Sequence, residues 1–357
     1  MKVAIINRHR QDALGGSEIQ CDIIARSMLE RGNDIVYIAA DGRGKYPGVP
    51  YKICAVPLAA RDLTIACLSE QPSIIYWRLN KNYFRHVART MHARHIPLVF
   101  AASHLNDLMP WRVKPSSEHN ILGDLRRMLR ERWNYSGYRW VKGIVCQTPE
   151  QSKMAPLSRT TVIFNSGWPS NPRPFSWPRP YVVWVSNIKR AKRPELCVAL
   201  ASHLLTQGID VVMIGRMIDE GYSWLEGGAP GPQNLHYIGP RTLEEVDGVL
   251  AGARALVHTC MPEGFPNVFI QAWLQGIPTV SLEFDPAGII KSHRLGYVSA
   301  GDVQQFHKDV LQIATDSEIA CQAGNRARVF AHEYCVPGRN AARLEAFLAE
   351  VIEADDG

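Results

Sequence analysis

The sequence predicts an α/β protein of two Rossmann-like domains, each built on a doubly wound parallel sheet, and three observations support this. Short runs of branched apolar residues recur along the chain and alternate with stretches long enough for helices, which is the pattern of repeated β-α units. The segment Trp168–Pro180 holds five prolines in thirteen residues, and proline stiffens a chain and removes hydrogen-bond donors. The length of 357 residues exceeds that of a usual single domain. We therefore expect two sheets joined by a stiff linker, with a cleft between the carboxyl ends of their strands.

The proline-rich segment sets the expected domain boundaries. They are an N-terminal domain over residues 1–168, a linker over 169–180, a C-terminal domain over 181–335 and a last helical segment over 336–357. In the first domain, strands are expected at 2–6, 34–39, 74–77, 98–101, 143–146 and 161–164. In the second domain, they are expected at 181–185, 210–214, 236–238, 255–257 and 279–282.

The composition is that of an ordinary globular protein. Hydrophobic residues make up 46% and charged residues 21% of the chain, and the formal net charge is +6, which does not require a nucleic acid partner. The eight cysteines are scattered without a C-x-x-C pair, as in a reduced cytosolic protein. No signal peptide or run of 18 apolar residues is visible. We expect a cytoplasmic protein that at most docks on the inner face of the cell membrane.

A glycine pair, Gly15-Gly16, precedes the first expected helix, at residues 17–30, and follows the first strand. Glycine leaves room for a ligand to approach the backbone, and the N–H groups of a helix start attract phosphate. The G-x-G-x-x-G fingerprint of dinucleotide-binding proteins is absent, which argues against an oxidoreductase. A plain tight turn into a helix is the alternative.

Polar residues also follow the strand at 98–101, in the sequence A-S-H-L-N-D. His104 and Asp107 lie just past the carboxyl end of that strand, where open α/β sheets hold ligands. A lone histidine is as often structural as functional, so both interpretations stay open.

The segment 112–142 is the most basic part of the chain. Within it, residues 121–133 form an amphipathic helix in which leucines and Trp133 share one face and arginines surround them. Such a helix can lie on an anionic membrane surface. Alternatively, it packs its leucine face inward and leaves its arginines in solvent.

Two loops of the second half place charged groups at strand ends. Residues 186–193 read S-N-I-K-R-A-K-R, and cations between a strand and a helix could offset the charge of a diphosphate; a solvated basic turn is the alternative. Farther along, T-C-M-P-E-G-F-P-N-V-F-I-Q holds Glu263 in a turn after a strand. We expect Asn267 to cap a helix over 268–275, whose N-terminal N–H groups would suit an anionic ligand.

Together these features resemble the glycosyltransferases of the GT-B fold, specifically glycosyltransferase family 4, the group 1 type. The resemblance covers both halves and is strongest from 181 to 300. The family carries an E-x7-E motif, and the matching frame here is E-G-F-P-N-V-F-I-Q, with Glu263 first and Gln271 in place of the second acid. The family's Arg-x4-Lys clamp is also altered, because Lys192 fits the lysine whereas Asn187 stands where arginine is expected.

The resemblance implies a role for each matched position. Glu263 would hold the hydroxyls of the donor sugar, Gln271 the nucleotide ribose through its amide, and Lys192 the diphosphate. The remaining donor-binding positions would be Gly15, Gly16, Asn187, Arg190, Gly215, Gly264, Phe265, Pro266, Asn267 and Val268. His104 would be the acceptor-side histidine, with Asn106-Asp107 as the alternative active pair. The final helix, 338–352, would cross back to the first domain.

The implied reaction moves a sugar from a nucleoside diphosphate sugar to a hydroxyl of a glycan or lipid-linked acceptor, with retention at the anomeric carbon. No D-x-D motif occurs, so no metal is expected. Three alternatives remain: a nucleotide-sugar 2-epimerase, a non-catalytic nucleotide-sugar or glycan-binding protein, and, least supported, the oxidoreductase. The motif alone predicts that Gln271→Glu is tolerated, because it restores the family's second acid.

Overall fold

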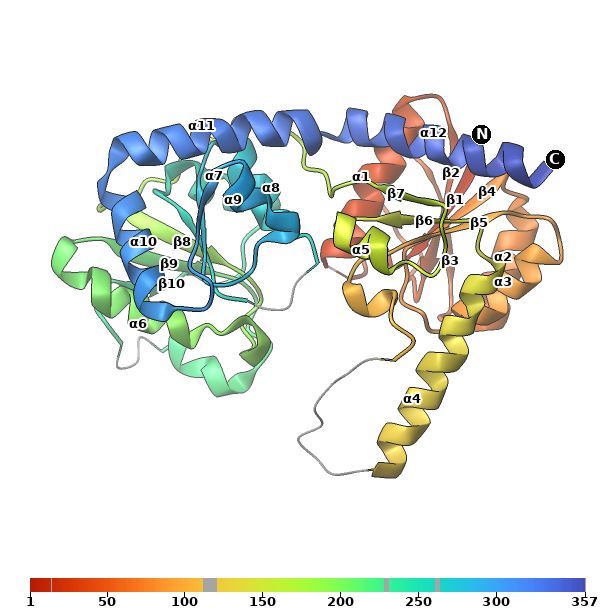
Figure 1. The fold of residues 1–357 in the computed structure, drawn as a ribbon, viewed down its shortest axis with the longest axis horizontal. Helices are drawn as coiled ribbons and strands as arrows, with labels where there is room; N and C mark the ends of the chain where they lie inside the picture. Colours follow the sequence, from red (N-terminus) through yellow and green to blue (C-terminus); the bar gives the residue numbers. More distant parts are fainter. Residues whose placement is uncertain (14, 112–120, 228–230, 261–263, 357) are drawn as a thin grey trace. The chain divides into compact units, whose positions relative to one another are not determined.

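The computed structural model describes residues 1–13, 15–111, 121–227, 231–260 and 264–356. The chain divides into two compact units, Met1–Ser166 with Pro337–Gly357, and Gly167–Val336. In each unit, helices cover a parallel sheet, as Figure 1 shows. The predicted fold class, two doubly wound α/β domains, is confirmed.

The first unit holds a seven-stranded sheet in the order β3-β2-β1-β4-β5-β6-β7. Its strands are β1 (Lys2–Asn7), β2 (Asp34–Ala40), β3 (Lys52–Val56), β4 (Ile74–Trp77), β5 (Leu98–Ala101), β6 (Gly143–Cys146) and β7 (Thr160–Val162). All neighbouring pairs are parallel. Both faces are buried, because successive residues of β1 such as Ile5 and Ile6 enter separate apolar cores, which explains why the strands are continuous apolar runs.

The helices of the first unit are α1 (Gly16–Glu30), α2 (Ala60–Glu70), α3 (Phe84–His92), α4 (Ile121–Tyr135), α5 (Pro149–Met154) and α12 (Pro337–Asp356), with short 3₁₀ turns η1 (Leu105–Asp107) and η2 (Ser136–Trp140). Although α12 ends the chain, it supplies Leu344, Phe347 and Leu348 to one core of this unit. Glu345 of α12 also accepts hydrogen bonds from Arg31 at 2.6 Å and Asn33 at 2.7 Å.

The second unit holds a six-stranded sheet in the order β10-β9-β8-β11-β12-β13, and its neighbouring strands are parallel. Its strands are β8 (Tyr181–Val185), β9 (Asp210–Ile214), β10 (Leu235–Tyr237), β11 (Leu256–His258), β12 (Thr279–Ser281) and β13 (Gly296–Val298). Its helices are α6 (Glu195–Leu204), α7 (Leu243–Gly252), α8 (Asn267–Leu274), α9 (Ile289–Ser292), α10 (Val303–Thr315) and α11 (Ser317–Tyr334), with 3₁₀ turns η3 (Arg190–Lys192), η4 (Leu205–Gln207), η5 (Glu220–Leu225) and η6 (Pro286–Gly288).

The proline-rich segment belongs to the second unit and packs along it. Ser170 donates to Asp247 at 2.9 Å, the Phe175 N–H donates to the Gly248 carbonyl at 2.9 Å, and Trp177 donates to Asp210 at 2.8 Å. The sequence predicts a stiff linker over residues 169–180, and in the structure this segment bonds to the second unit through Ser170, Phe175 and Trp177.

The strand order reverses direction once in each sheet, between β1 and β4 in the first and between β8 and β11 in the second. Open α/β sheets hold ligands at such switch points, beside the carboxyl ends of the strands. The loops that follow β1, β4, β5, β8 and β11 are therefore the places to look for a site.

Candidate functional site

In the second unit, the loop after β8 is fastened to the loop after β11. The Thr259 hydroxyl donates to the Lys192 carbonyl at 2.7 Å and accepts from the Trp184 indole at 3.0 Å, and the Cys260 thiol donates to the Ala191 carbonyl at 3.3 Å. The 3₁₀ turn that carries Lys192 is thereby held against the segment that leads toward Glu263. Glu263 itself lies outside the described residues, as do its two preceding neighbours.

Lys192 is the cation that burial affects most in this loop. Burial lowers its pKa, and the Cys260 thiol partly offsets that effect. Next to it, burial lowers the pKa of His258 to about 3, with the charge of Lys192 as a second cause. His258 is therefore neutral at physiological pH and packs edge-on against Phe269, so it adds no positive charge beside Lys192. By contrast, Asn187 and Arg190 are exposed to solvent.

Gly215 has a structural explanation that does not require a ligand. Its φ is 155°, and a Cβ at this position would overlap the carbonyl oxygen of Ser186. The two strand-end loops pair beyond it, since the Ile188 N–H donates to the Arg216 carbonyl at 2.8 Å. Glycine is thus needed for the close approach of the two loops, whatever binds nearby.

The start of α8 differs from the predicted one by one residue. Pro266, with φ −66° and ψ 124°, occupies the N-cap, and Asn267 is the first helical residue rather than the cap. The proline side chain has no oxygen that could accept a capping hydrogen bond from a helix N–H, and no side-chain hydrogen bond caps this end. The Phe269 N–H donates to the Pro266 carbonyl at 3.1 Å, and the N–H of Val268 lies in the first turn, where a helix favours an anionic ligand. Phe265 is buried edge-on against Trp273 and fixes how the chain enters the helix, whereas Gly264 is half-buried.

The side chain of Gln271 is held by a carboxylate that the sequence pattern does not indicate. Its side-chain amide donates to Asp247 of α7 at 2.9 Å. The other oxygen of Asp247 accepts from Ser170 at 2.9 Å, and Ser170 accepts from Gln275 at 2.9 Å. Burial raises the pKa of Asp247, while its two hydrogen bonds act against that shift. The amide at 271 therefore has a fixed orientation, with its nitrogen toward Asp247.

In the first unit, Gly15 is the extended N-cap of α1, and Gly16 is its first residue. A Cβ on Gly15 would overlap the carboxylate of Glu18, which accepts from the Ser17 hydroxyl at 2.9 Å. The glycine at this position lets an acidic side chain fold over the start of the helix, where the positive end of the helix dipole favours it.

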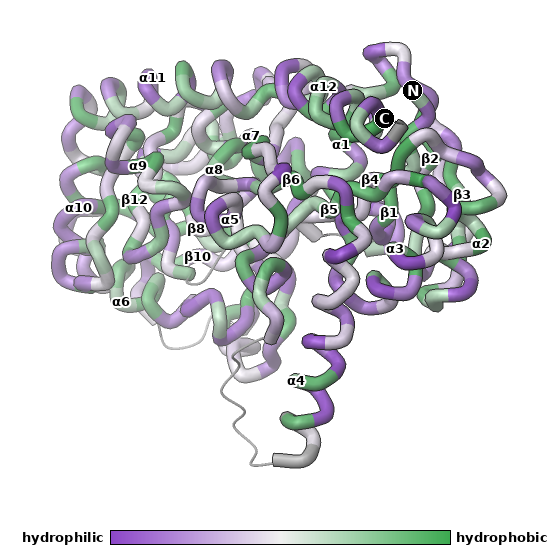
Figure 2. Tube along the Cα trace, turned by 45° about the vertical axis from the view of Figure 1, so that its right-hand side comes forward, coloured by the Kyte–Doolittle hydropathy of each residue, from purple (hydrophilic) through white to green (hydrophobic). Residues whose placement is uncertain are grey.

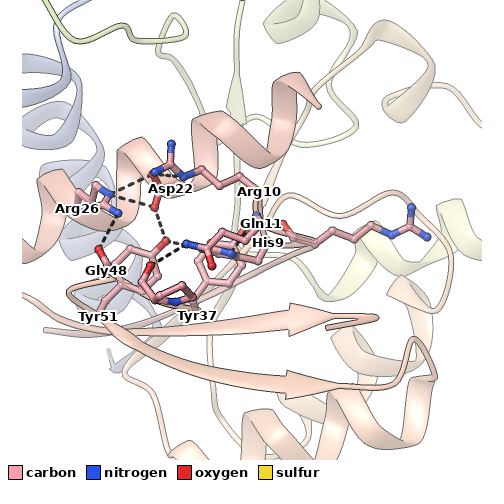
Figure 3. A network of polar contacts seen from close by, with 10 residues as sticks. His9, Arg10, Gln11, Asp22, Arg26, Tyr37, Gly48 and Tyr51 are labelled. Atoms are coloured by element: carbon pink, nitrogen blue, oxygen red, sulfur yellow. Dashed lines mark hydrogen bonds and ion pairs between the residues drawn. The ribbon is translucent and has the colours of Figure 1, made fainter. Parts of the chain in front are cut away.

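The loop that leads to this glycine pair is anchored by a buried network, shown in Figure 3. His9 is fully buried and lies 3.1 Å from the Tyr51 hydroxyl, which donates to Asp22 at 2.6 Å. Arg10 and Arg26 both reach Asp22, at 3.0 and 3.1 Å. Burial lowers the pKa of His9, so it stays neutral while the two arginines offset the buried carboxylate. Residues from three separate segments form this network, and no spacing in the sequence indicates it.

His104 and Asp107 lie together after β5, as predicted, but they bond mainly to their own loop. Asp107 accepts from the backbone N–H groups of Ser103 at 3.0 Å and His104 at 2.9 Å. His104 Nδ1 accepts from the Asn106 N–H at 3.1 Å. Asp107 is 8% exposed and accepts both backbone hydrogen bonds through Oδ2, and its role as a reacting carboxylate stays a prediction. It shapes the loop that presents His104.

Among the described residues, no three His, Cys, Asp or Glu side chains gather as a metal-binding group. None of the helices in this part of the chain is long and apolar enough to cross a membrane.

Comparisons with known proteins agree with this architecture. Residues 179–316 match the family model described as glycosyl transferases group 1, so the resemblance found in the sequence is confirmed over that range. A search of curated protein sequences returned no match.

Three solved structures illustrate the likeness of fold. Sucrose-phosphate synthase from Thermosynechococcus elongatus has a TM-score of 0.79 at 12% identity, covering 99% of this chain and 100% of its own. Anabaena HepE, in complex with UDP and glucose, has a TM-score of 0.73 at 15% identity, covering 98% and 100%. TarM of S. aureus, in complex with UDP, has a TM-score of 0.73 at 10% identity, covering 97% and 99%. At these identities the likeness is one of fold, and that fold is GT-B.

Proposed function

We propose that this chain, a protein of GT-B fold whose residues 179–316 match group 1 glycosyltransferases, transfers a sugar from a nucleoside diphosphate sugar to an acceptor hydroxyl, with retention at the anomeric carbon. The observation that carries the proposal is the joined pair of loops after β8 and β11. It holds a half-buried lysine against the segment leading to the uncapped start of α8, and both loops lie within the matched range.

The second unit would hold the donor. In the reaction, the bond between the anomeric carbon and the diphosphate oxygen breaks, and the diphosphate leaves with the electron pair. Lys192 and the N–H groups at the start of α8 would stabilise that charge, because burial strengthens their electrostatic effect. Glu263 would position the sugar hydroxyls. Gln271 would accept a hydrogen bond from a ribose hydroxyl through its amide oxygen, because its amide nitrogen is the atom that bonds to Asp247.

The first unit would hold the acceptor, whose hydroxyl oxygen forms the new bond to the anomeric carbon on the face that the diphosphate leaves. The hydroxyl proton would pass to the departing diphosphate oxygen. Correct alignment of the acceptor supplies most of the remaining acceleration. His104, presented by its capped turn, is the first candidate to contact the acceptor.

A lipid-linked or membrane-proximal acceptor is supported by α4. Four apolar side chains of this helix remain exposed: Leu125, Met128, Leu129 and Trp133 are 52%, 47%, 60% and 60% exposed. Figure 2 shows α4 projecting from the rest of its unit, with hydrophobic and hydrophilic residues interspersed along it. Exposed apolar side chains beside arginines suit an anionic lipid surface, and this favours the membrane interpretation over the inward-packed one.

This membrane interpretation has a direct test. Replacing Arg126, Arg127 and Arg130 with Glu should release the protein from vesicles that contain phosphatidylglycerol, because each basic residue near such a surface contributes about 1 kcal/mol. A matched control replaces the exposed Arg61, Arg89 and Arg94 with Glu, which gives the same change of net charge elsewhere on the first unit. Equal behaviour of the two variants would remove the membrane proposal.

The donor proposal is tested by a thermal-shift screen against nucleoside diphosphates and their sugars, with uridine diphosphate first because HepE and TarM bind UDP. A ligand that binds the folded state raises the Tm, and the shift grows with the logarithm of the ligand concentration above its Kd. Transfer is then followed with radiolabelled donor. Binding without transfer or hydrolysis would favour a non-catalytic binding protein, and a changed sugar without any acceptor would indicate a 2-epimerase.

A further inference from the structure

A pocket of about 300 Å³ lies in the first unit, where the start of α3 meets the last turns of α4. Asn82, Tyr83, Arg85 and His86 line it from the α3 side, and Arg130 and Trp133 from the α4 side. The volume is at the lower end of small-molecule sites. The lining combines two aromatic rings with several nitrogen donors in one concave surface. This combination indicates a ligand-binding site rather than a packing defect.

The charge of this pocket is one-sided. Arg85 and Arg130 line it together with His86, and no carboxylate does. Arg130 is exposed and forms no ion pair with a described residue. Two arginines in a lining that holds no carboxylate attract an anion, and the guanidinium group matches phosphate or carboxylate oxygens in pairs.

The aromatic part of the pocket is held in place. The guanidinium of Arg85 lies 3.6 Å from the ring centre of Trp133, and its Nε donates to the Ser136 hydroxyl at 2.8 Å. The stacked arginine covers one face of the indole, yet Trp133 as a whole remains 60% exposed. Tyr83 is 41% exposed, and its backbone φ is 63°. This left-handed backbone conformation is rare for a bulky side chain. Exposed rings beside cations offer an apolar platform for the flat side of a sugar.

The pocket is coupled to the loop that presents His104. Lys81, one residue before the lining, is 1% exposed and donates to the carbonyls of Asn106 at 2.9 Å and Met109 at 2.6 Å. It also pairs with Glu131 of α4 at 3.4 Å. The loop after β4 therefore binds the His104 loop on one side and lines the pocket on the other, which places the pocket at the carboxyl edge of the first sheet.

We propose that this pocket binds an anionic sugar, one that carries a phosphate or a carboxylate, as part of the acceptor. The ring would stack on Trp133 and Tyr83, and the anionic group would lie between Arg85 and Arg130. The assignment of this sugar to the acceptor rests on the proposed function, because it names the chemical class of the group that the first unit receives. The presence of an anion-binding sugar pocket can be tested without any transfer reaction.

The test follows the indole N–H signals of the ¹⁵N-labelled full chain by NMR, with the Trp133 signal identified from the variant Trp133→Phe. Glucose 1-phosphate and glucuronic acid are the two anionic probes, and glucose and inorganic phosphate are the controls. We expect at least one anionic sugar to shift the Trp133 signal saturably, with an affinity at least about tenfold above that of glucose or phosphate alone. The anionic sugar that binds more tightly shows which group the pocket prefers.

Arg130→Gln should weaken that binding about tenfold or more, because it removes a charged donor. Arg126→Gln, on the same helix but outside the lining, should leave it unchanged. Equal weakening by both variants would reduce the effect to general surface charge and overturn the proposal, as would equal binding of glucose or an unmoved Trp133 signal.

The same samples separate this inference from the proposed function. If a nucleoside diphosphate raises the Tm but no anionic sugar shifts the Trp133 signal, the proposed sugar transfer still holds and the proposed sugar pocket is refuted. Saturable binding at Trp133 without any nucleotide binding supports the sugar site and refutes both the donor site and the acceptor role.

Discussion

The substitution Gln271→Glu tests the contact between α7 and α8. In the present chain the Gln271 amide donates to the Asp247 carboxylate at 2.9 Å. Glutamate has nearly the same shape but no donor, so two carboxylates would face each other at that distance. Although the sequence motif alone predicts that this change is tolerated, the structure gives a physical reason to expect the reverse.

The expected magnitude combines two effects. A hydrogen bond to a charged group contributes about 1.5–3 kcal/mol, and this is lost. Two like charges about 3 Å apart repel by about 5 kcal/mol at an effective dielectric constant of 20, but solvent screens a half-exposed pair and proton uptake relieves it. We expect a net loss of about 2 kcal/mol in the free energy of unfolding at pH 8, which lowers the Tm of the second unit by about 4–8 °C.

The effect should depend on pH with a defined sign. Burial already raises the pKa of Asp247, and a second carboxylate raises the pKa of the pair further. The native pair then binds more protons than the unfolded chain, so stability falls as pH rises through the raised pKa. Below about pH 4, where both states are protonated, the repulsion between the two side chains disappears.

Scanning calorimetry at pH 5 and pH 8 measures the difference. The control is the double variant Gln271→Glu with Asp247→Asn, which exchanges acid and amide between the two helices and should regain most of the lost stability. Affinity for the nucleoside diphosphate should fall in the single variant and recover in the double one, since position 271 is the proposed ribose contact. A loss that is the same at both pH values, or that the double variant does not repair, would refute the reasoning.

Three further predictions concern the reaction. Glu263→Gln should lower the rate of transfer by orders of magnitude while leaving the Tm within about 1 °C, because the amide keeps the shape but loses the charge that positions the sugar. Steady-state kinetics with radiolabelled donor would measure the rate. An unchanged rate would show that the motif belongs to the fold and has no role in transfer. Burial lowers the pKa of Lys192, so nucleoside diphosphate affinity should decline as pH rises through a value below 10.5, and calorimetric titration should find that Lys192→Ala abolishes this decline and weakens binding about tenfold or more. Transfer should persist in excess EDTA, and complete loss that Mg²⁺ restores would overturn the proposed metal-independent mechanism.

The strands of both sheets were predictable because they are buried on both faces. Continuous branched runs such as Ile74–Trp77 and Tyr181–Val185 match β4 and β8 residue for residue, since no solvent-facing side chain interrupts them. The strands β3, Lys52–Val56, and β13, Gly296–Val298, were missed. Both lie at the edge of a sheet, are mostly half-buried and begin with a lysine or a glycine, so their patterns do not differ from that of a loop.

The loops that carry the candidate site residues were predictable, but the long-range contacts were not. Strand ends after apolar runs place Lys192 and His104 in the loops after β8 and β5, where the structure has them, whereas the Thr259 contact of Lys192 comes from a distant segment. Asp247 lies 24 residues before Gln271, and no local spacing indicates that contact. The helical periodicity of α4 identifies an apolar face but not what covers that face, and the exposure of Leu129 could only come from the structure.

The place of α12 in the first unit has a consequence for the order in which the protein folds. One core of that unit needs Leu344, Phe347 and Leu348, which the ribosome adds only after the whole of Gly167–Val336. During synthesis the second unit, a single uninterrupted stretch, has all its residues while the first still lacks the helix that covers one face of its sheet. The half of the protein that is made first is therefore the half whose core is completed last.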